Sequence, residues 1–186
     1  MGLCAPGYGG TTVGSPAASG HEFLSSSRFG SPKALARLEG ETLAERGWRT
    51  LGQACEHTIA VGKVADGLRL PFPVLDDGSD IRAPIVGLAA GLRAAPTELC
   101  VALPVDCPLV SAAMLLELAD ACRDAARFQR GPLPGAFRRG TLAALGSGEL
   151  AIHRVITNLD VAVLQADPAL LVNVNTPQDL EALAVT

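Results

Sequence analysis

The sequence predicts one α/β domain with a mostly parallel β-sheet and helices on both of its faces. Short apolar segments of strand length alternate with amphipathic segments along most of the chain, which is the pattern of this class. The length of 186 residues suits one domain and is too short for two ordinary ones. Hydrophobic residues make up 48% and aromatic residues only 4%, so we expect an aliphatic core.

The first expected elements lie between residues 42 and 75. Thr42 followed by Glu45 has the spacing of a capping box, and apolar residues then recur every four positions, which predicts a helix over 42–54. The apolar run at 58–61 predicts a short buried strand, and 72–75 a second one.

An apolar run or a helix-start signal predicts each of the later helices and strands. They are a helix from Pro84, a strand over 99–103, a helix over 112–126 capped by Ser111, strands over 159–164 and 170–174, and a helix from Pro177. Ligands of such folds bind at the carboxyl ends of the strands. The polar residues directly after each strand are therefore the informative ones.

The N-terminal segment differs from the rest of the chain. Residues 1–24 are rich in Gly, Pro, Ala and Ser and show no sustained periodicity, a composition that predicts irregular structure. The predicted domain therefore comprises residues 25–186, preceded by an atypical segment over 1–24.

Charge and cysteine content exclude several classes of function. The net charge of −4 offers no basic face for a nucleic acid. No apolar run reaches the roughly 18 residues that a membrane span needs. The five cysteines have no CxxC spacing, so neither a disulfide framework nor a zinc site is indicated, and we expect a reducing, cytoplasmic setting.

The first candidate site is a basic turn that contains Ser27, Arg28, Gly30 and Lys33. Small residues and hydroxyl groups can present hydrogen-bond donors to phosphate oxygens. Arg28 can grip phosphate with its forked guanidinium, and Lys33 can act as a point charge. From local sequence alone, a solvated turn before a helix is the alternative.

Carboxylates and amides follow the expected strands. Asp106 comes just after the strand at 99–103, between two prolines that fix its position, so it can hold Mg²⁺ against a triphosphate or serve only as a turn residue. Asp77 follows the strand at 72–75 and can accept hydrogen bonds from a base or ribose, or lie in a solvated acidic turn. Asn173 and Asn175 can line a site or cap the chain locally.

In order along the chain, these pieces resemble the motifs of the molybdenum cofactor guanylyltransferase family, the MobA-type nucleotidyltransferases. The resemblance covers about residues 25–184. Ser27, Arg28, Gly30 and Lys33 match the second half of a LAGGxSxRxGxxK loop, Ala83–Gly87 resembles GPLAG, Val105–Pro108 resembles CDxP, Pro132–Arg139 resembles PLxALYRR, and Asn173–Asp179 resembles NxNTPED.

The resemblance implies a Rossmann-like three-layer α/β/α fold and transfer of GMP from Mg-GTP to the phosphate of molybdopterin, with release of pyrophosphate. The implied partners are GTP and molybdopterin, with transient contacts to cofactor-biosynthesis proteins or molybdoenzymes. By the same resemblance, Lys33 and Arg28 hold phosphates with Ser27 and Gly30 beside them, Asp106 binds the cofactor Mg²⁺, Asp77 contacts the nucleoside, and Asn175 and Arg138 lie near the second substrate.

The chain departs from the family pattern at residues 21–24. His21, Glu22, Phe23 and Leu24 stand where the family has LAGG, and side chains there obstruct the close approach of backbone to phosphate that glycine permits. Two alternatives accompany the guanylyltransferase interpretation, because base choice rests on few contacts and because the two glycines are missing. One is a cytidylyltransferase for the same cofactor, and the other is a catalytically inactive homologue that binds a nucleotide or a partner.

Overall fold

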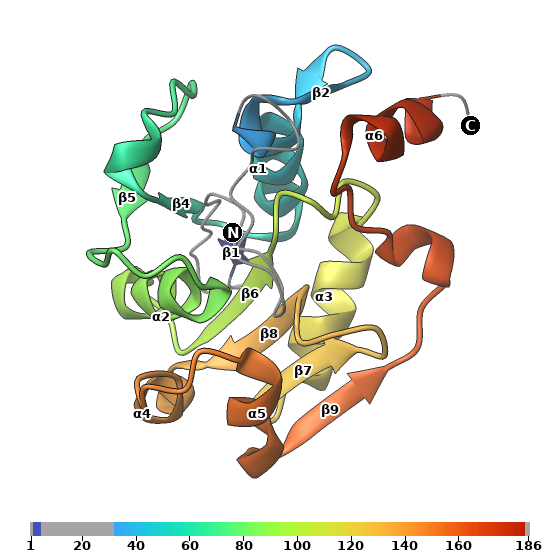
Figure 1. Cartoon of the computed structure of the whole chain (residues 1–186). Coiled ribbons are helices and arrows are strands. Elements are labelled where there is room, and N and C mark those ends of the chain that lie inside the picture. Colours follow the sequence, from blue (N-terminus) through green and yellow to red (C-terminus); the bar gives the residue numbers. More distant parts are fainter. Residues whose placement is uncertain (1, 5–31, 185–186) are drawn as a thin grey trace.

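The structure is a computed structural model that describes residues 2–4 and 32–184 of the chain. Its centre is a seven-stranded sheet with the strand order β5-β4-β1-β6-β8-β7-β9 (Figure 1). The strands are β1 (Gly2–Cys4), β4 (Ile59–Gly62), β5 (Val74–Asp76), β6 (Leu99–Leu103), β7 (Ala125–Phe128), β8 (Gly135–Arg138) and β9 (Val161–Leu164). A separate ribbon pairs β2 (Arg37–Leu38) with β3 (Glu41–Thr42).

Five of these seven strands run in one direction. β4 is parallel to β5 and β7 to β9, while β1 is antiparallel to both of its neighbours and β8 to both of its own. The strands β4, β5, β6, β7 and β9 therefore share one direction, which confirms the predicted mostly parallel sheet. Residues that follow these five strands lie at the same edge of the sheet.

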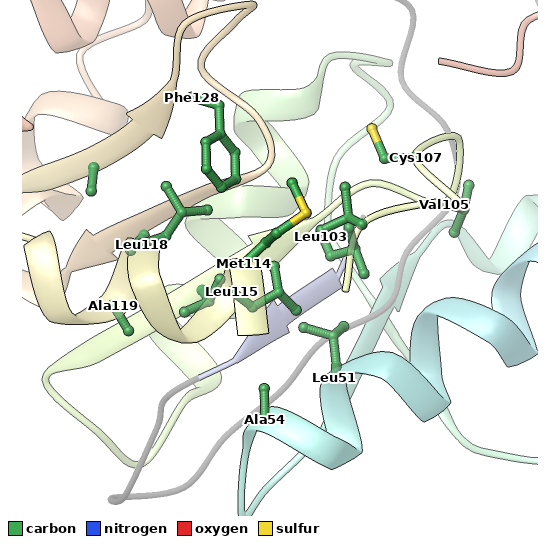
Figure 2. Packing of buried hydrophobic residues seen from close by; sticks show 14 of the residues in the cluster. Leu51, Ala54, Leu103, Val105, Cys107, Met114, Leu115, Leu118, Ala119 and Phe128 are labelled. Carbon is green, nitrogen blue, oxygen red and sulfur yellow. The ribbon is translucent and has the colours of Figure 1, made fainter. Parts of the chain in front are cut away.

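Helices cover both faces, which confirms the three-layer α/β/α fold (Figure 1). They are α1 (Leu43–Ala54), α2 (Pro84–Ala94), α3 (Ala112–Ala121), α4 (Leu142–Leu145), α5 (Ile152–Val155) and α6 (Pro177–Ala184). Buried residues of α1 and α3 form one core with Val101, Leu103, Ala126 and Phe128; in Figure 2, Leu51 of α1 lies against Leu115 of α3 and Leu103 of β6. Buried residues of α2, α4 and α5 form the other core with Cys100, Ala102, Ala125 and Phe137.

The strand period of two explains this division between the two cores. Successive side chains of a strand point to opposite faces of the sheet, so the residues of β6 and of β7 divide alternately between the cores. Both faces of β6 are thereby buried, which is why its sequence is a continuous apolar run.

The helix-start signals predicted from the sequence are confirmed. The hydroxyl of Thr42 accepts from the main-chain N–H of Glu45 at 3.1 Å, and the Glu45 carboxylate accepts from the N–H of Thr42 at 3.0 Å. α2 begins at Pro84, and the Ser111 hydroxyl caps α3 by accepting from the N–H of Met114 at 3.3 Å.

One predicted helix end and one predicted strand are wrong. α3 ends at Ala121 rather than at 126, because the chain from Ala125 joins the sheet between β8 and β9. The segment 170–174 is not a strand: Pro168–Leu171 forms the 3₁₀ helix η6, and the buried Val174 packs with Leu38 and Leu43 outside the sheet.

Part of the N-terminal segment also differs from expectation. Gly2–Cys4 form β1 between β4 and β6, where strand pairing satisfies their backbone groups on both sides. The prediction of irregular structure is therefore wrong for residues 2–4, and the rest of the segment lies outside the described residues.

Two expectations from composition can be compared with the structure. Cys100, Cys107 and Cys122 are free, whereas Cys55 is disulfide-bonded, so a disulfide is present although the cysteine spacing indicated no disulfide framework. Within the described ranges, the helices are too short or too polar to cross a membrane.

Candidate functional site

Lys33, Asp106 and Asn175 meet at the edge of the sheet where β6 ends. The Lys33 Nζ lies 3.6 Å from Oδ2 of Asp106 and donates to Oδ1 of Asn175 at 3.1 Å. The lysine and aspartate side chains are only 11% and 12% exposed, so water screens their charges less than it would at an open surface. The predicted proximity of Lys33 and Asp106 is thus present in the fold.

The chain around Asp106 is held on two sides. The N–H of Cys107 donates to the carbonyl of Pro104 at 3.2 Å, and the Asp106 carbonyl accepts from the N–H of Val174 at 2.8 Å. The Cys107 thiol lies 3.8 Å from Oδ1 of Asp106 and 3.5 Å from Oδ1 of Asn173. Burial, with a further contribution from the Asp106 carboxylate, raises the pKa of Cys107 well above its ordinary value, so this thiol is a neutral packing group.

A helix cap positions Asn175 beside Lys33. Oδ2 of Asp179 accepts from the N–H groups of Asn175 and Thr176, both at 2.8 Å, and the Thr176 hydroxyl accepts from the N–H of Asp179 at 3.2 Å. The Asn175 N–H contributes most to lowering the pKa of Asp179. This reciprocal cap confirms the predicted start of α6 and places the last motif of the chain at the site.

Asp77 lies at the same sheet edge but is already paired. Both of its carboxylate oxygens accept from Nζ of Lys63 at 2.9 Å, and the same ammonium donates to the carbonyl of Ser79. The side chains of Lys63 and Asp77 are 11% and 8% exposed. β5, which precedes Asp77, is three strands from β6, roughly 14 Å at the usual strand spacing.

Sequence reasoning missed Lys63, although a signal was available. Lys63 follows β4 directly, which is the position where polar residues of this fold class carry information. No motif includes Lys63, and its partner in the acidic turn, Asp77, lies 14 residues further along the chain.

Arg138 is a correction to the predicted site. β8 runs antiparallel to β6, and Arg138 pairs with Leu99 at the beginning of β6, so it lies at the edge opposite Asp106. Its guanidinium donates to the carbonyls of Arg123 at 2.6 Å and Cys122 at 3.4 Å, just beyond α3. The prediction that Arg138 lies near the second substrate is therefore wrong.

The basic turn is described only from its last residues. Ser27, Arg28 and Gly30 lie outside the described residues, and their roles stay predictions. Lys33 begins the short 3₁₀ helix η2 (Lys33–Leu35), and the buried Ala34 of that helix anchors it in the same core as α1.

The fold and this edge together define a class: an α/β protein that gathers charged groups where its strands end, as nucleotide-binding folds do. Residues 25–160 match the MobA-like NTP transferase domain. The chain therefore belongs to the MobA-like nucleotidyltransferase family of transferase enzymes.

Similar proteins agree with this membership. The chain is 33% identical over 181 residues to a molybdenum cofactor guanylyltransferase of Burkholderia vietnamiensis, covering 83% of this chain and 88% of the relative. It is 32% identical over 181 residues to one of Burkholderia ambifaria, with the same coverage of each chain.

Solved structures show the same fold at lower identity. A nucleotidyl transferase from Methanothermobacter superposes with a TM-score of 0.75 at 21% identity, covering 96% of this chain and 97% of that one. The molybdopterin-guanine dinucleotide biosynthesis protein A of Archaeoglobus fulgidus gives 0.71 at 22% identity, covering 94% and 96%. A 2-C-methyl-D-erythritol 4-phosphate cytidylyltransferase of Thermus thermophilus gives 0.63 at 21%, covering 83% and 94%.

Proposed function

We propose that the chain transfers GMP from Mg-GTP to the terminal phosphate of molybdopterin and releases pyrophosphate. The observation that carries this proposal is the meeting of Lys33, Asp106 and Asn175 at the carboxyl edge of the sheet. Its second support is that the Burkholderia relatives, matched over most of their length, are named molybdenum cofactor guanylyltransferases.

The reaction is an in-line displacement at the α-phosphorus of GTP. A phosphate oxygen of molybdopterin forms the new bond, the bond from the α-phosphorus to the bridging oxygen breaks, and pyrophosphate leaves with that electron pair. The attacking phosphate is already an anion, so the step needs charge neutralisation and positioning more than a protein base. The Lys33 ammonium, held by Asn175 and Asp106, supplies a preorganised positive charge for the triphosphate, and Arg28 of the same turn would supply a second.

The residues at this edge fit Mg²⁺ bound together with a triphosphate. Magnesium in such sites takes one or two carboxylates, with phosphate oxygens and water completing its shell. Asp106 offers one carboxylate. The amide oxygen of Asn173 contacts the same Cys107 thiol as this carboxylate, and that of Asn175 contacts the same Lys33 ammonium. Residues 32–184 hold no cluster of three or more His, Cys, Asp or Glu side chains suited to a metal. Asp106 would hold the ion together with phosphate oxygens of GTP, and the bound ion would neutralise charge on the phosphates.

The nucleoside end of GTP would extend along the sheet edge towards β4 and β5. Lys63 would hold the Asp77 carboxylate in position. The carboxylate lone pairs that do not accept from Lys63 would accept hydrogen bonds from the nucleoside. Ser27 and Gly30 would line the phosphates, and Asn175 would lie towards the molybdopterin phosphate.

The direct test incubates the purified full chain with molybdopterin and either Mg-GTP or Mg-CTP, and measures dinucleotide and pyrophosphate. The proposal predicts the guanine dinucleotide and an equal amount of pyrophosphate. Product from CTP alone would establish the cytidylyltransferase alternative instead. If neither nucleotide gave product, the proposal would be refuted, and calorimetric binding of Mg-GTP without turnover would identify an inactive nucleotide-binding homologue.

A further inference from the structure

A cavity of about 420 Å³ lies against β7 and β9, away from the Lys33–Asp106 site. The 3₁₀ helix η5 (Ile156–Asn158), His153 of α5 and the turn after β7 form part of its wall. The basic lining residues are Arg127, Arg130 and His153, and the apolar ones include Ile156, Val161 and Val163. This size is within the range of small-molecule pockets.

The short helices of this face explain the cavity. Residues of α5 and η5 pack on Ala125 and Val161 at the beginning of β7 and β9. The next pair on the same face is Arg127 beside Val163. Helical cover stops short of that pair, so Val163 remains 48% exposed beside a guanidinium.

The cationic groups of the cavity are not neutralised by carboxylates. Nη1 of Arg127 donates to the carbonyl of Phe128 at 3.0 Å, and Nη1 of Arg130 donates to the carbonyl of Pro168 at 3.2 Å. Among the ion pairs formed by residues 32–184, none includes Arg127, Arg130 or His153. Each arginine is thus anchored through one nitrogen to main chain and keeps its positive charge at the cavity. The lining is cationic in a chain whose net charge is −4.

The turn that carries Arg130 is fixed rather than loose. The Gln129 side chain donates to the carbonyl of Ala166 at 2.7 Å and accepts from its N–H at 3.1 Å. These two hydrogen bonds to the main chain of Ala166 tie the end of β7 to the segment after β9. The turn that carries Arg130 is therefore held in place before any ligand arrives.

We propose that this cavity binds an organic phosphate. The phosphate would lie between the guanidiniums of Arg127 and Arg130, which suit its oxygens in forked geometry. The organic part would cover Val161, Val163 and Ile156, and burial of that apolar surface favours an organic phosphate over the inorganic ion. None of the cavity's lining residues belongs to the Lys33–Asp106 site, and β7 is two strands from β6 in the sheet, roughly 10 Å.

The test uses phenyl phosphate as the probe, with inorganic phosphate and benzyl alcohol as comparators, and calorimetry on the full chain. Phenyl phosphate should bind more tightly than either comparator. Arg127→Gln and Arg130→Gln should each weaken its binding about tenfold. Arg123→Gln is the matched control, since that arginine is exposed and paired with Asp160 outside the cavity. Binding should be unchanged in Arg123→Gln and in Lys33→Gln.

Three results would overturn the proposal. They are no binding of phenyl phosphate up to about 10 mM, loss of binding in Lys33→Gln, and full binding in both cavity variants. Circular dichroism of each variant separates loss of the site from loss of the fold: Arg127 lies within β7, whereas Arg130 lies in the turn after it, so Arg130→Gln keeps the test decisive if Arg127→Gln unfolds.

Discussion

Replacement of Lys63 by methionine tests the buried ion pair at the nucleoside end of the proposed site. The change leaves the Asp77 carboxylate, 8% exposed, without its partner and the Ser79 carbonyl without its donor. Removing one member of a buried pair typically costs 3–5 kcal/mol, and the slight exposure here places the expected loss at about 3 kcal/mol. With a slope near 2 kcal/mol per molar urea, the unfolding midpoint should fall by about 1.5 M.

Urea titration followed by the fluorescence of the single tryptophan gives this quantity. Trp48 stacks on Phe72 with ring centroids 4.2 Å apart, so its signal reports on the segment between β4 and β5 as well as on α1. The double variant Lys63→Met, Asp77→Leu removes both charges and should recover at least half of the loss. Arg93→Met, an exposed change, should alter stability by less than about 0.5 kcal/mol. A Lys63→Met midpoint equal to that of the original protein, or a double variant no more stable than the single one, would refute the reasoning.

Three further predictions concern local structure. Thr42→Ala removes the capping box of α1 and should cost about 1 kcal/mol in urea unfolding, while Thr42→Ser should cost less; equal losses would contradict the cap. Gly135→Ala brings a Cβ within 2.5 Å of the Pro132 carbonyl and 2.9 Å of the Ala126 carbonyl, and should destabilise by about 1–3 kcal/mol. Gly140→Ala meets nothing within 4 Å and should be neutral, so a comparable loss there would count against the packing argument. The N–H of Asn175 lowers the pKa of Asp179 in the folded state below 3.8. The stability that the Asp179 carboxylate contributes is therefore present above its unfolded-state pKa and is lost as pH falls through its folded-state pKa. Asp179→Asn should accordingly lose less stability than the original protein on acidification below about pH 4, and parallel pH profiles of the two proteins would exclude this role.

The elements with strong local signals could be predicted from the sequence. The capping box at Thr42 and the apolar run of β6 each determine their element almost alone. The end of α3 could not be placed, because the alanine-rich residues up to 126 favour helix while pairing with β8 and β9 draws Ala125 into the sheet. The apolar residues at 170–174 suggest a strand, yet Val174 is buried outside the sheet.

The sequence predicted the site residues that lie at the carboxyl ends of the parallel strands. It did not predict the position of a residue whose sheet edge depends on the direction of its strand. Lys33 and Asp106 were expected together, and the fold brings them within 3.6 Å of each other. Arg138 was misplaced because the motif gives no information on the direction of β8, which carries that residue to the far edge. Lys63 belongs to no motif; its one sequence signal is its place directly after β4, and its importance becomes clear from its contact with Asp77.

The pairing of a lysine charge with a single carboxylate at the end of β6 is the central claim, and the rate of pyrophosphate release from Mg-GTP with molybdopterin tests it most directly. Asp106→Asn keeps the shape of the side chain and removes its charge, while Asp120→Asn makes the same change at an exposed position of α3. The account predicts at least a hundredfold lower rate for Asp106→Asn, about 2.7 kcal/mol of transition-state stabilisation, and an unchanged rate for Asp120→Asn. Equal rates for the two variants would contradict it.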